Sequence, residues 1–121
     1  MTGFPLAFVI EDYMDQAIVF SKALEMAGYR VETILDGAAA KQRLNEVTPA
    51  LIVLDLHIPK VTGEMLLQQI RSEERFRQTR VVLATADNLL AERLRPMADL
   101  TLLKPISFVQ LNQLAQRLLT H

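Results

Sequence analysis

Leu51-Ile52-Val53-Leu54-Asp55 is the stretch of sequence that decides the fold, because four apolar residues run directly into one carboxylate. Pro49 opens this stretch and Pro59 closes it. A short apolar run between such residues predicts a strand over about 50–54 that is buried on both faces. Strands of this kind are typical of parallel sheets with helices on both sides. Ligands of such sheets bind beyond the carboxyl ends of the strands, so we expect Asp55 at the mouth of a site.

Three more strands are predicted from apolar runs that each end in a polar residue. They are Leu6 to Ile10 followed by Glu11 and Asp12, Val81 to Ala84 followed by Thr85, and Leu100 to Leu103 followed by Lys104. The stretch 29–34 alternates between apolar and polar residues, which favours a half-exposed edge strand. Because the carboxyl ends of parallel strands share one edge of the sheet, we expect these polar residues to lie together.

Helices are expected between the strands, over about residues 14–27, 37–47, 63–72, 89–97 and 107–119. Gly28 is placed to end the first helix, Asp36 and Thr62 to cap the next two, and Ser107 with Gln110 forms a capping box. The spacing of apolar residues predicts the inward side chains of the first, third and last helices: Met14, Ala17, Ile18, Ser21, Leu24 and Ala27; Met65, Leu66 and Ile70; Leu111, Leu114, Ala115 and Leu118.

The arginine-rich segment 72–79 is interpreted as a solvated helix end and loop, with an anion site as the less favoured alternative. Strand and helix thus alternate five times along the chain. This order predicts one α/β domain over residues 1–121, with a parallel five-stranded sheet, right-handed crossovers and helices on both faces.

Composition excludes several classes of function. The 121 residues carry a formal net charge of −1, which gives no electrostatic case for direct binding of nucleic acid or of an anionic membrane. The absence of cysteine excludes disulfides, thiolate catalysis and cysteine zinc sites. No apolar run approaches the roughly 20 residues of a membrane span, and the first residues make a poor signal peptide. A cytoplasmic protein is expected.

The polar residues at the strand ends suggest phosphoryl-transfer chemistry. Carboxylates at Glu11, Asp12 and Asp55 repel one another, and a hard divalent cation such as Mg²⁺ removes that conflict. Lys104 adds a cation and Thr85 a hydroxyl donor. These groups suit phosphoryl transfer to a free carboxylate, which would form an acyl phosphate. Taken singly, each has a plainer explanation, such as helix N-terminal charges for Glu11-Asp12 or an ordinary surface lysine for Lys104.

Taken together, these motifs resemble a known family. The chain resembles a response-regulator receiver domain of two-component signal transduction, the CheY-like family, from about Leu6 to Leu119. The motifs that carry the resemblance are the acidic pair Glu11-Asp12, Asp55 with Pro59 and Gly63 after it, Thr85-Ala86, and Lys104-Pro105. The resemblance implies a doubly wound, flavodoxin-like (βα)5 domain with the strand order 2-1-3-4-5.

The resemblance also implies a role for each motif residue. Asp55 would be the phospho-acceptor, and Asp12 a direct Mg²⁺ ligand with Glu11 acting through a metal-bound water. His57 would give its backbone carbonyl to the metal. Thr85 and Lys104 would bind phosphoryl oxygens, and the Lys104–Pro105 peptide bond would be cis. His57 and Asp87 stand where the family tunes the lifetime of its phosphate.

The sequence departs from the family pattern at two positions. Glu11 stands where aspartate is more usual, which is a tolerated variant. Thr101 stands three residues before the lysine, where the family has Tyr or Phe. That aromatic side chain normally moves together with the threonine, so Thr101 leaves the coupling between site and surface open. The phosphorylation chemistry does not depend on it.

The partners that the resemblance implies are a histidine kinase or phosphotransfer protein as donor, and a downstream protein or fused output domain. The readout surface is expected over 89–97, 100–103 and 107–119, where a homodimer could also form. Such a domain catalyses only its own phosphorylation and dephosphorylation. Two alternatives are a phosphorylation-independent interaction module of the same fold and a Mg²⁺-dependent phosphohydrolase. The second is disfavoured because His57 replaces the acid/base aspartate that such enzymes commonly have.

Overall fold

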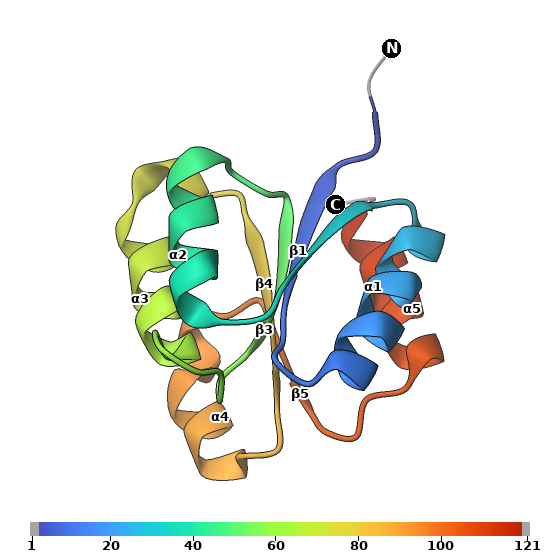
Figure 1. The fold of residues 1–121 in the computed structure, drawn as a ribbon. Helices are drawn as coiled ribbons and strands as arrows, with labels where there is room; N and C mark the ends of the chain where they lie inside the picture. Colours follow the sequence, from blue (N-terminus) through green and yellow to red (C-terminus); the bar gives the residue numbers. More distant parts are fainter. Residues whose placement is uncertain (1–2, 120–121) are drawn as a thin grey trace.

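The computed structural model describes residues 3–119, which form one five-stranded parallel sheet (Figure 1). The strands are β1 (Leu6–Ile10), β2 (Arg30–Ile34), β3 (Leu51–Asp55), β4 (Arg80–Thr85) and β5 (Leu100–Leu103). Their order across the sheet is β2-β1-β3-β4-β5, and each neighbouring pair is parallel. The predicted order 2-1-3-4-5 and the edge position of the second strand are therefore confirmed.

Five helices cover the two faces of the sheet. They are α1 (Met14–Ala27), α2 (Gly37–Glu46), α3 (Gly63–Ser72), α4 (Asn88–Leu94) and α5 (Phe108–Leu119). Helices α1 and α5 lie side by side on one face, and α2, α3 and α4 cover the other (Figure 1). Short 3-10 turns follow α3 at Glu74–Phe76 and α4 at Arg95–Met97.

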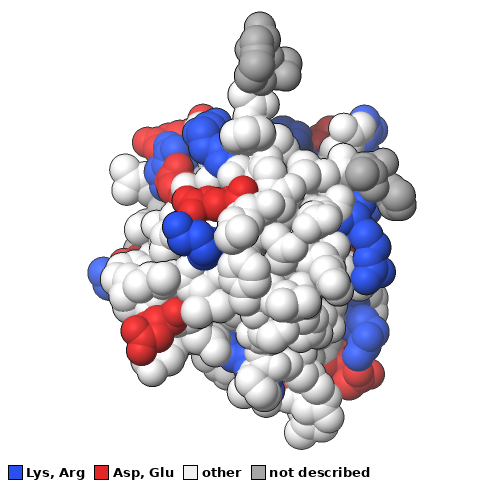
Figure 2. Space-filling model, turned by 90° about the vertical axis from the view of Figure 1, so that its right-hand side faces the viewer, with Lys and Arg blue, Asp and Glu red and all other residues white. Residues whose placement is uncertain are grey.

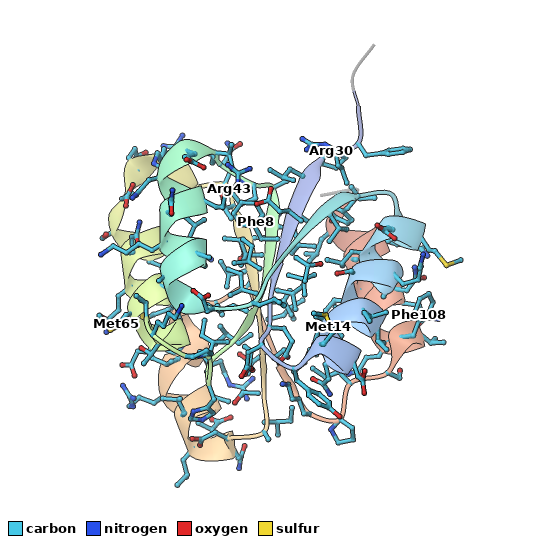
Figure 3. All side chains as sticks on the ribbon, in the orientation of Figure 1. Phe8, Met14, Arg30, Arg43, Met65 and Phe108 are labelled. Carbon is cyan, nitrogen blue, oxygen red and sulfur yellow. The ribbon has the colours of Figure 1, made fainter. Side chains whose placement is uncertain are left out.

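Alternation along the strands divides the core between the two faces. In β1, Phe8 and Ile10 pack with α2 and α3, whereas Ala7 and Val9 pack with α1 and α5. Side chains fill the space on both sides of the sheet (Figure 3). Strand β3 is buried along its whole length, as the apolar run predicts.

The predicted helix ends are confirmed by their hydrogen bonds. Gly28 ends α1 with a φ of 115°, in the left-handed region that glycine adopts without strain. Asp36 Oδ1 accepts from the Ala39 amide at 2.8 Å, and Thr62 Oγ1 accepts from the Met65 amide at 3.2 Å. Before α5, the Gln110 amide donates to Ser107 Oγ at 3.0 Å. Interactions between residues close in sequence therefore fix where these helices begin or end.

The inward face of α1 was predicted wrongly in part. Met14 and Ile18 are 50% and 57% exposed, whereas Phe20 and Ala23 are buried beside Ala17. Apolar residues occupy more than one side of α1, and the packing of α5 against it selects which side is covered.

The face of α3 needs a similar correction. Met65, expected to face the core, is 55% exposed, and Leu67 is fully buried together with Leu66 and Ile70. Figure 3 shows Met65 on the outer side of the helix layer. Two positions along an α-helix correspond to more than half a turn, so Met65 and Leu67 lie on opposite sides of α3, and the core-facing side is that of Leu67.

The segment 72–79 is also more ordered than the expected solvated loop. Phe76 is fully buried in its 3-10 turn, and the Arg75 guanidinium lies 4.0 Å from the centroid of its ring. Arg75 donates to Glu73 and to the Leu44 carbonyl, while Arg71 donates to Asp99 and to the Met97 carbonyl. These arginines therefore serve the packing of the segment, and the alternative of an anion site finds no support here.

The face formed by α1 and α5 is mostly uncharged at its centre (Figure 2). Exposed apolar side chains from α1 include Met14, Ile18, Val19 and Met26. Between α1 and β2 an apolar groove of about 400 Å³ is lined by Met14, Ile18 and Leu35, among others. Within residues 3–119, no helix combines the length and the apolar character that a membrane crossing requires.

Candidate functional site

The register of the sheet brings four strand ends to one edge. Ile10 of β1 pairs with Leu54 of β3, Asp55 pairs with Ala84 of β4, and Thr85 pairs with Leu103 of β5. The residues that form these pairs or directly follow them are therefore neighbours across the sheet, although they are far apart in sequence. The expectation that Glu11-Asp12, Asp55, Thr85 and Lys104 share an edge follows directly from this register.

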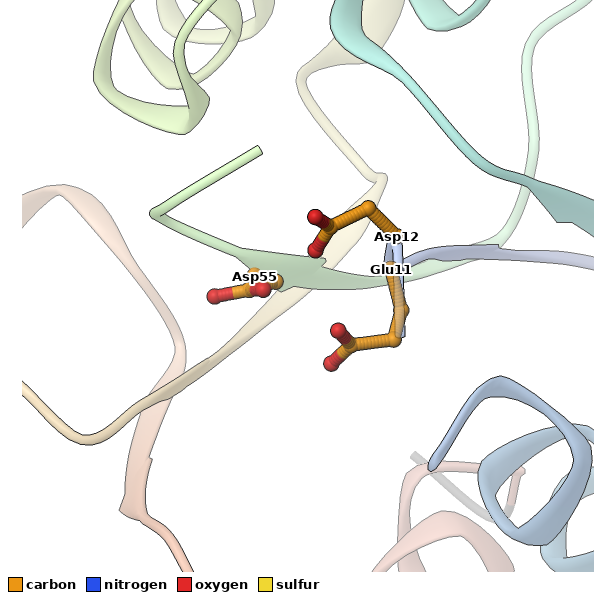
Figure 4. Close-up of side chains that lie close together, drawn as sticks. All are labelled: Glu11, Asp12 and Asp55. Carbon is orange, nitrogen blue, oxygen red and sulfur yellow. The ribbon is translucent and has the colours of Figure 1, made fainter. Parts of the chain in front are cut away.

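Glu11, Asp12 and Asp55 form a carboxylate cluster (Figure 4). One oxygen from each residue lies within 4.8 Å of the others; Glu11 and Asp55 are buried and Asp12 is exposed. Buried carboxylates this close favour a divalent cation, because Mg²⁺ binds oxygen ligands and keeps several waters. The donor set thus fits Mg²⁺, with the exposed Asp12 on the solvent side.

Lys104 provides the positive charge of the cluster. Its Nζ lies 2.8 Å from Glu11 Oε1 and 3.5 Å from Asp55 Oδ2. The second oxygen of Glu11 accepts from the Tyr13 amide at 3.1 Å. Burial raises the pKa of Glu11, while the hydrogen bonds from Lys104 and from the Tyr13 amide act in the opposite direction. Lys104 therefore holds together two carboxylates that would otherwise repel.

Asp55 and Thr85 are both fixed by backbone amides two residues further along the chain. Asp55 Oδ1 accepts from the His57 amide at 3.1 Å, and Thr85 Oγ1 accepts from the Asp87 amide at 3.0 Å. Thr85 is fully buried and Asp55 is 5% exposed. Both side chains are thus oriented toward the edge of the sheet before any ligand arrives.

His57 and Asp87 contact each other across this edge. His57 Nε2 lies 3.1 Å from Asp87 Oδ2, and Asp87 Oδ1 accepts from the Leu90 amide at the start of α4. The pKa of Asp87 is lowered, first by the Leu90 amide and then by His57. Both residues were predicted from the sequence, but their contact was not, because residues 30 positions apart carry no pairing signal.

The remaining predicted features are found on β5 and just after it. The Lys104–Pro105 peptide bond is cis, as the resemblance implied. The Lys104 amide donates to the Thr85 carbonyl at 2.8 Å, which fixes this segment to the end of β4. Thr101 Oγ1 is buried and has no hydrogen-bond partner among the described residues. The hydroxyl in place of an aromatic ring therefore adds no polar connection between β5 and the site.

Comparison with known proteins identifies the family. Residues 7–116 match the family model "Response regulator receiver domain". The chain is 33% identical over 110 residues to the phosphate regulon transcriptional regulatory protein PhoB of Rhizobium meliloti, which covers 88% of this chain and 48% of that protein. It is 34% identical over 104 residues to the DNA-binding dual master transcriptional regulator RpaA of Synechocystis, covering 84% of this chain and 43% of that protein.

These relatives are longer proteins, and the chain spans about half of their length. A solved structure similar to the chain over most of its length is the signal receiver domain of a signal transduction histidine kinase from Syntrophus aciditrophicus. The TM-score is 0.84 at 28% identity, with 96% of this chain and 90% of that chain covered. On the match over residues 7–116, together with the strand order and the carboxylate cluster, the chain belongs to the response-regulator receiver domain family of two-component signalling.

Proposed function

We propose that Asp55 accepts a phosphoryl group, in a Mg²⁺-dependent reaction, from the phosphohistidine of a histidine kinase or phosphotransfer protein. The observation that carries this proposal is the position of the Asp55 carboxylate, within 4.8 Å of oxygens of Glu11 and Asp12 and 3.5 Å from Lys104 Nζ. A free carboxylate surrounded by a cation-binding cluster and a lysine has the groups that in-line phosphoryl transfer requires. Residues 1–121 would act as one receiver domain.

In the proposed step, an Asp55 oxygen attacks phosphorus and the phosphorus–nitrogen bond of the donor breaks. The imidazole leaves with the electron pair, and the product is an acyl phosphate on Asp55. Asp12, Asp55 and the His57 carbonyl would hold Mg²⁺, with Glu11 acting through water, and the metal would neutralise charge on the phosphoryl oxygens. Lys104 would pair with one phosphoryl oxygen, and the Thr85 hydroxyl would donate a hydrogen bond to another.

The phosphoryl group would then shift the domain between two conformations that a partner or output domain distinguishes. The proposed readout surface comprises α4, β5 and α5, where Leu89, Leu103 and Val109 are 82%, 47% and 59% exposed. A homodimer could use the same surface, within 89–119. The protein would act in the cytoplasm and would catalyse only its own phosphorylation and dephosphorylation.

A direct test is to incubate the protein with Mg²⁺ and a small acyl-phosphate donor and to measure the intact mass. We expect one phosphoryl group on the natural protein and none on Asp55→Asn. Asp15→Asn, which changes an exposed aspartate in the first turn of α1, serves as the control and should accept the group normally. No adduct with any donor would instead favour the phosphorylation-independent interaction module.

We further propose that His57 and Asp87 set the lifetime of the aspartyl phosphate, because their 3.1 Å contact spans the edge beside Asp55. Removal of either side chain should open the phosphoryl group to water, so that His57→Ala and Asp87→Ala lose it several times faster. The decay of purified phosphoprotein, followed by intact mass after the donor is removed, gives the rate. Decay rates equal to that of the natural protein would refute this role.

A further inference from the structure

Helix α4 is weakly anchored in the apolar core. It spans only Asn88–Leu94, and of its residues only Ala91 and Leu94 are buried, while Leu89 is 82% exposed. A helix of two turns with so small a buried face gains little from packing. Its position therefore depends more than that of the other helices on the polar contacts at its two ends.

The contact at the carboxyl end of α4 is a bidentate ion pair with α3. Arg93 Nη1 and Nη2 lie 2.9 Å from Glu64 Oε2 and Oε1, respectively. Glu64 lies in the first turn of α3, shortly after the loop that follows Asp55. The hydrogen bonds from Arg93 lower the pKa of Glu64. Two parallel bonds between a guanidinium and a carboxylate fix the relative orientation of the two helices as well as their distance.

The contacts at the amino end connect α4 to the site. Asp87 caps α4 through the Leu90 amide, and its own amide donates to Thr85 Oγ1. A movement of Thr85 toward a phosphoryl group on Asp55 would stretch or break the bond from the Asp87 amide, and would so release or displace the start of α4. Because α4 has only seven residues, we expect it to move as a rigid unit, so that displacement of its first turn would also strain the ion pair at its last turn.

From these contacts we propose that the Glu64–Arg93 ion pair is an autoinhibitory contact. It holds α4 in its resting position against α3 and must yield when Thr85 moves. This inference rests on the proposed function, because it assigns a direction to the switch that phosphorylation of Asp55 would operate. The Arg93 side chain is 60% exposed and the Glu64 side chain 28% exposed. The pair therefore lies at the surface, where it can open without disturbing the core.

The size of the effect follows from the exposure of the pair. An exposed ion pair shifts a two-state equilibrium by about twofold to fivefold. Glu64→Gln and Arg93→Gln should therefore each raise the rate of Mg²⁺-dependent phosphorylation by a small acyl phosphate, and the affinity for beryllofluoride, within that range. Amide hydrogen exchange of residues 88–94 should also be faster in both unphosphorylated variants. The reversed pair, Glu64→Arg with Arg93→Glu, should return all three quantities toward the natural values.

Glu32→Gln is the matched control, because Glu32 also forms a two-bond ion pair, with Arg43, but between β2 and α2. Glu32→Gln should leave unchanged the phosphorylation rate, the affinity for beryllofluoride and the amide hydrogen exchange of residues 88–94. The inference is overturned if the Glu64 and Arg93 variants behave like the natural protein, or if Glu32→Gln gives the same increase. Absence of any adduct on the natural protein would count against the proposed function itself; hydrogen exchange of α4 would then still decide whether the ion pair holds the helix.

Discussion

Replacement of Gly63 with alanine is expected to lower the free energy of unfolding by about 2 kcal/mol, and to slow phosphorylation of Asp55. A Cβ atom at this position would lie 2.6 Å from the Asp55 carbonyl oxygen and 2.6 Å from Leu56 Cα. Both neighbours are backbone atoms, so no side chain can rotate away to make room. Helix α3 would have to move away from the end of β3, and this movement would displace the backbone that carries the Asp55 carboxylate.

Urea unfolding followed by circular dichroism measures the first effect, and intact mass after timed exposure to the donor measures the second. Gly3→Ala is the matched control, because a Cβ there meets nothing within 4 Å. If Gly63→Ala and Gly3→Ala had equal stability, the close approach of α3 to β3 would not constrain the site. Gly37→Ala tests the same idea at the start of α2, where a Cβ would lie only 1.6 Å from the Val61 carbonyl oxygen.

A second large loss of stability is expected for Lys104→Met in the absence of Mg²⁺. Loss of the ammonium leaves the buried carboxylates of Glu11 and Asp55 without their cation, and the free energy of unfolding at neutral pH should fall by about 3 kcal/mol. Methionine retains most of the apolar volume of the lysine stem, so the loss reports charge rather than packing. Phosphorylation should also slow strongly, because the proposed partner of one phosphoryl oxygen is gone.

The loss should depend on pH in a defined direction. Burial already raises the folded-state pKa of Glu11, and removal of the Lys104 hydrogen bond raises that pKa further. A carboxyl group whose pKa is higher in the folded state contributes stability below its unfolded pKa and loses it as the pH rises through its folded pKa. The free energy of unfolding of Lys104→Met should therefore be closest to that of the natural protein at acidic pH. The difference between the two should grow as the pH increases.

Unfolding in urea at several pH values, with and without Mg²⁺, tests this expectation. Added Mg²⁺ should restore part of the lost stability, because it supplies positive charge to the same carboxylates. Lys22→Met, which removes an exposed lysine paired with Glu25 on α1, is the control and should change stability by less than about 0.5 kcal/mol. A loss that is equal at every pH would mean that Lys104 acts through packing alone.

The elements of the fold could be predicted because their signals are local. The apolar run at 51–54, the left-handed position of Gly28 and the caps at Asp36 and Thr62 each depend on neighbours within a few residues. The location of the site followed from one additional rule, that parallel strands end at the same edge. The residues that end four strands could therefore be assigned to one cluster before any contact was known.

The contacts that escaped prediction all depend on packing between distant segments. The buried side of α1 was set by α5, and the burial of Phe76 by the sheet beneath it. The pairs Glu64–Arg93 and His57–Asp87 join residues about 30 positions apart, and each partner alone looks like an ordinary surface charge. Glu11 and Lys104 were both predicted as site residues, but their direct 2.8 Å contact joins side chains 93 positions apart, which periodicity does not encode.

The direction of the strands determines on which side of the domain a connected segment would attach, relative to the carboxylate cluster. The start of β1 and the end of α5 lie near the edge of the sheet where the strands begin, opposite the carboxylate cluster at the strand ends (Figure 1). A tether at either end would thus leave the entrance to Asp55 free for a donor. A domain attached at either end would be separated from the carboxylate cluster by the full length of the strands. It could respond to a change at Asp55 only through movement of the helices.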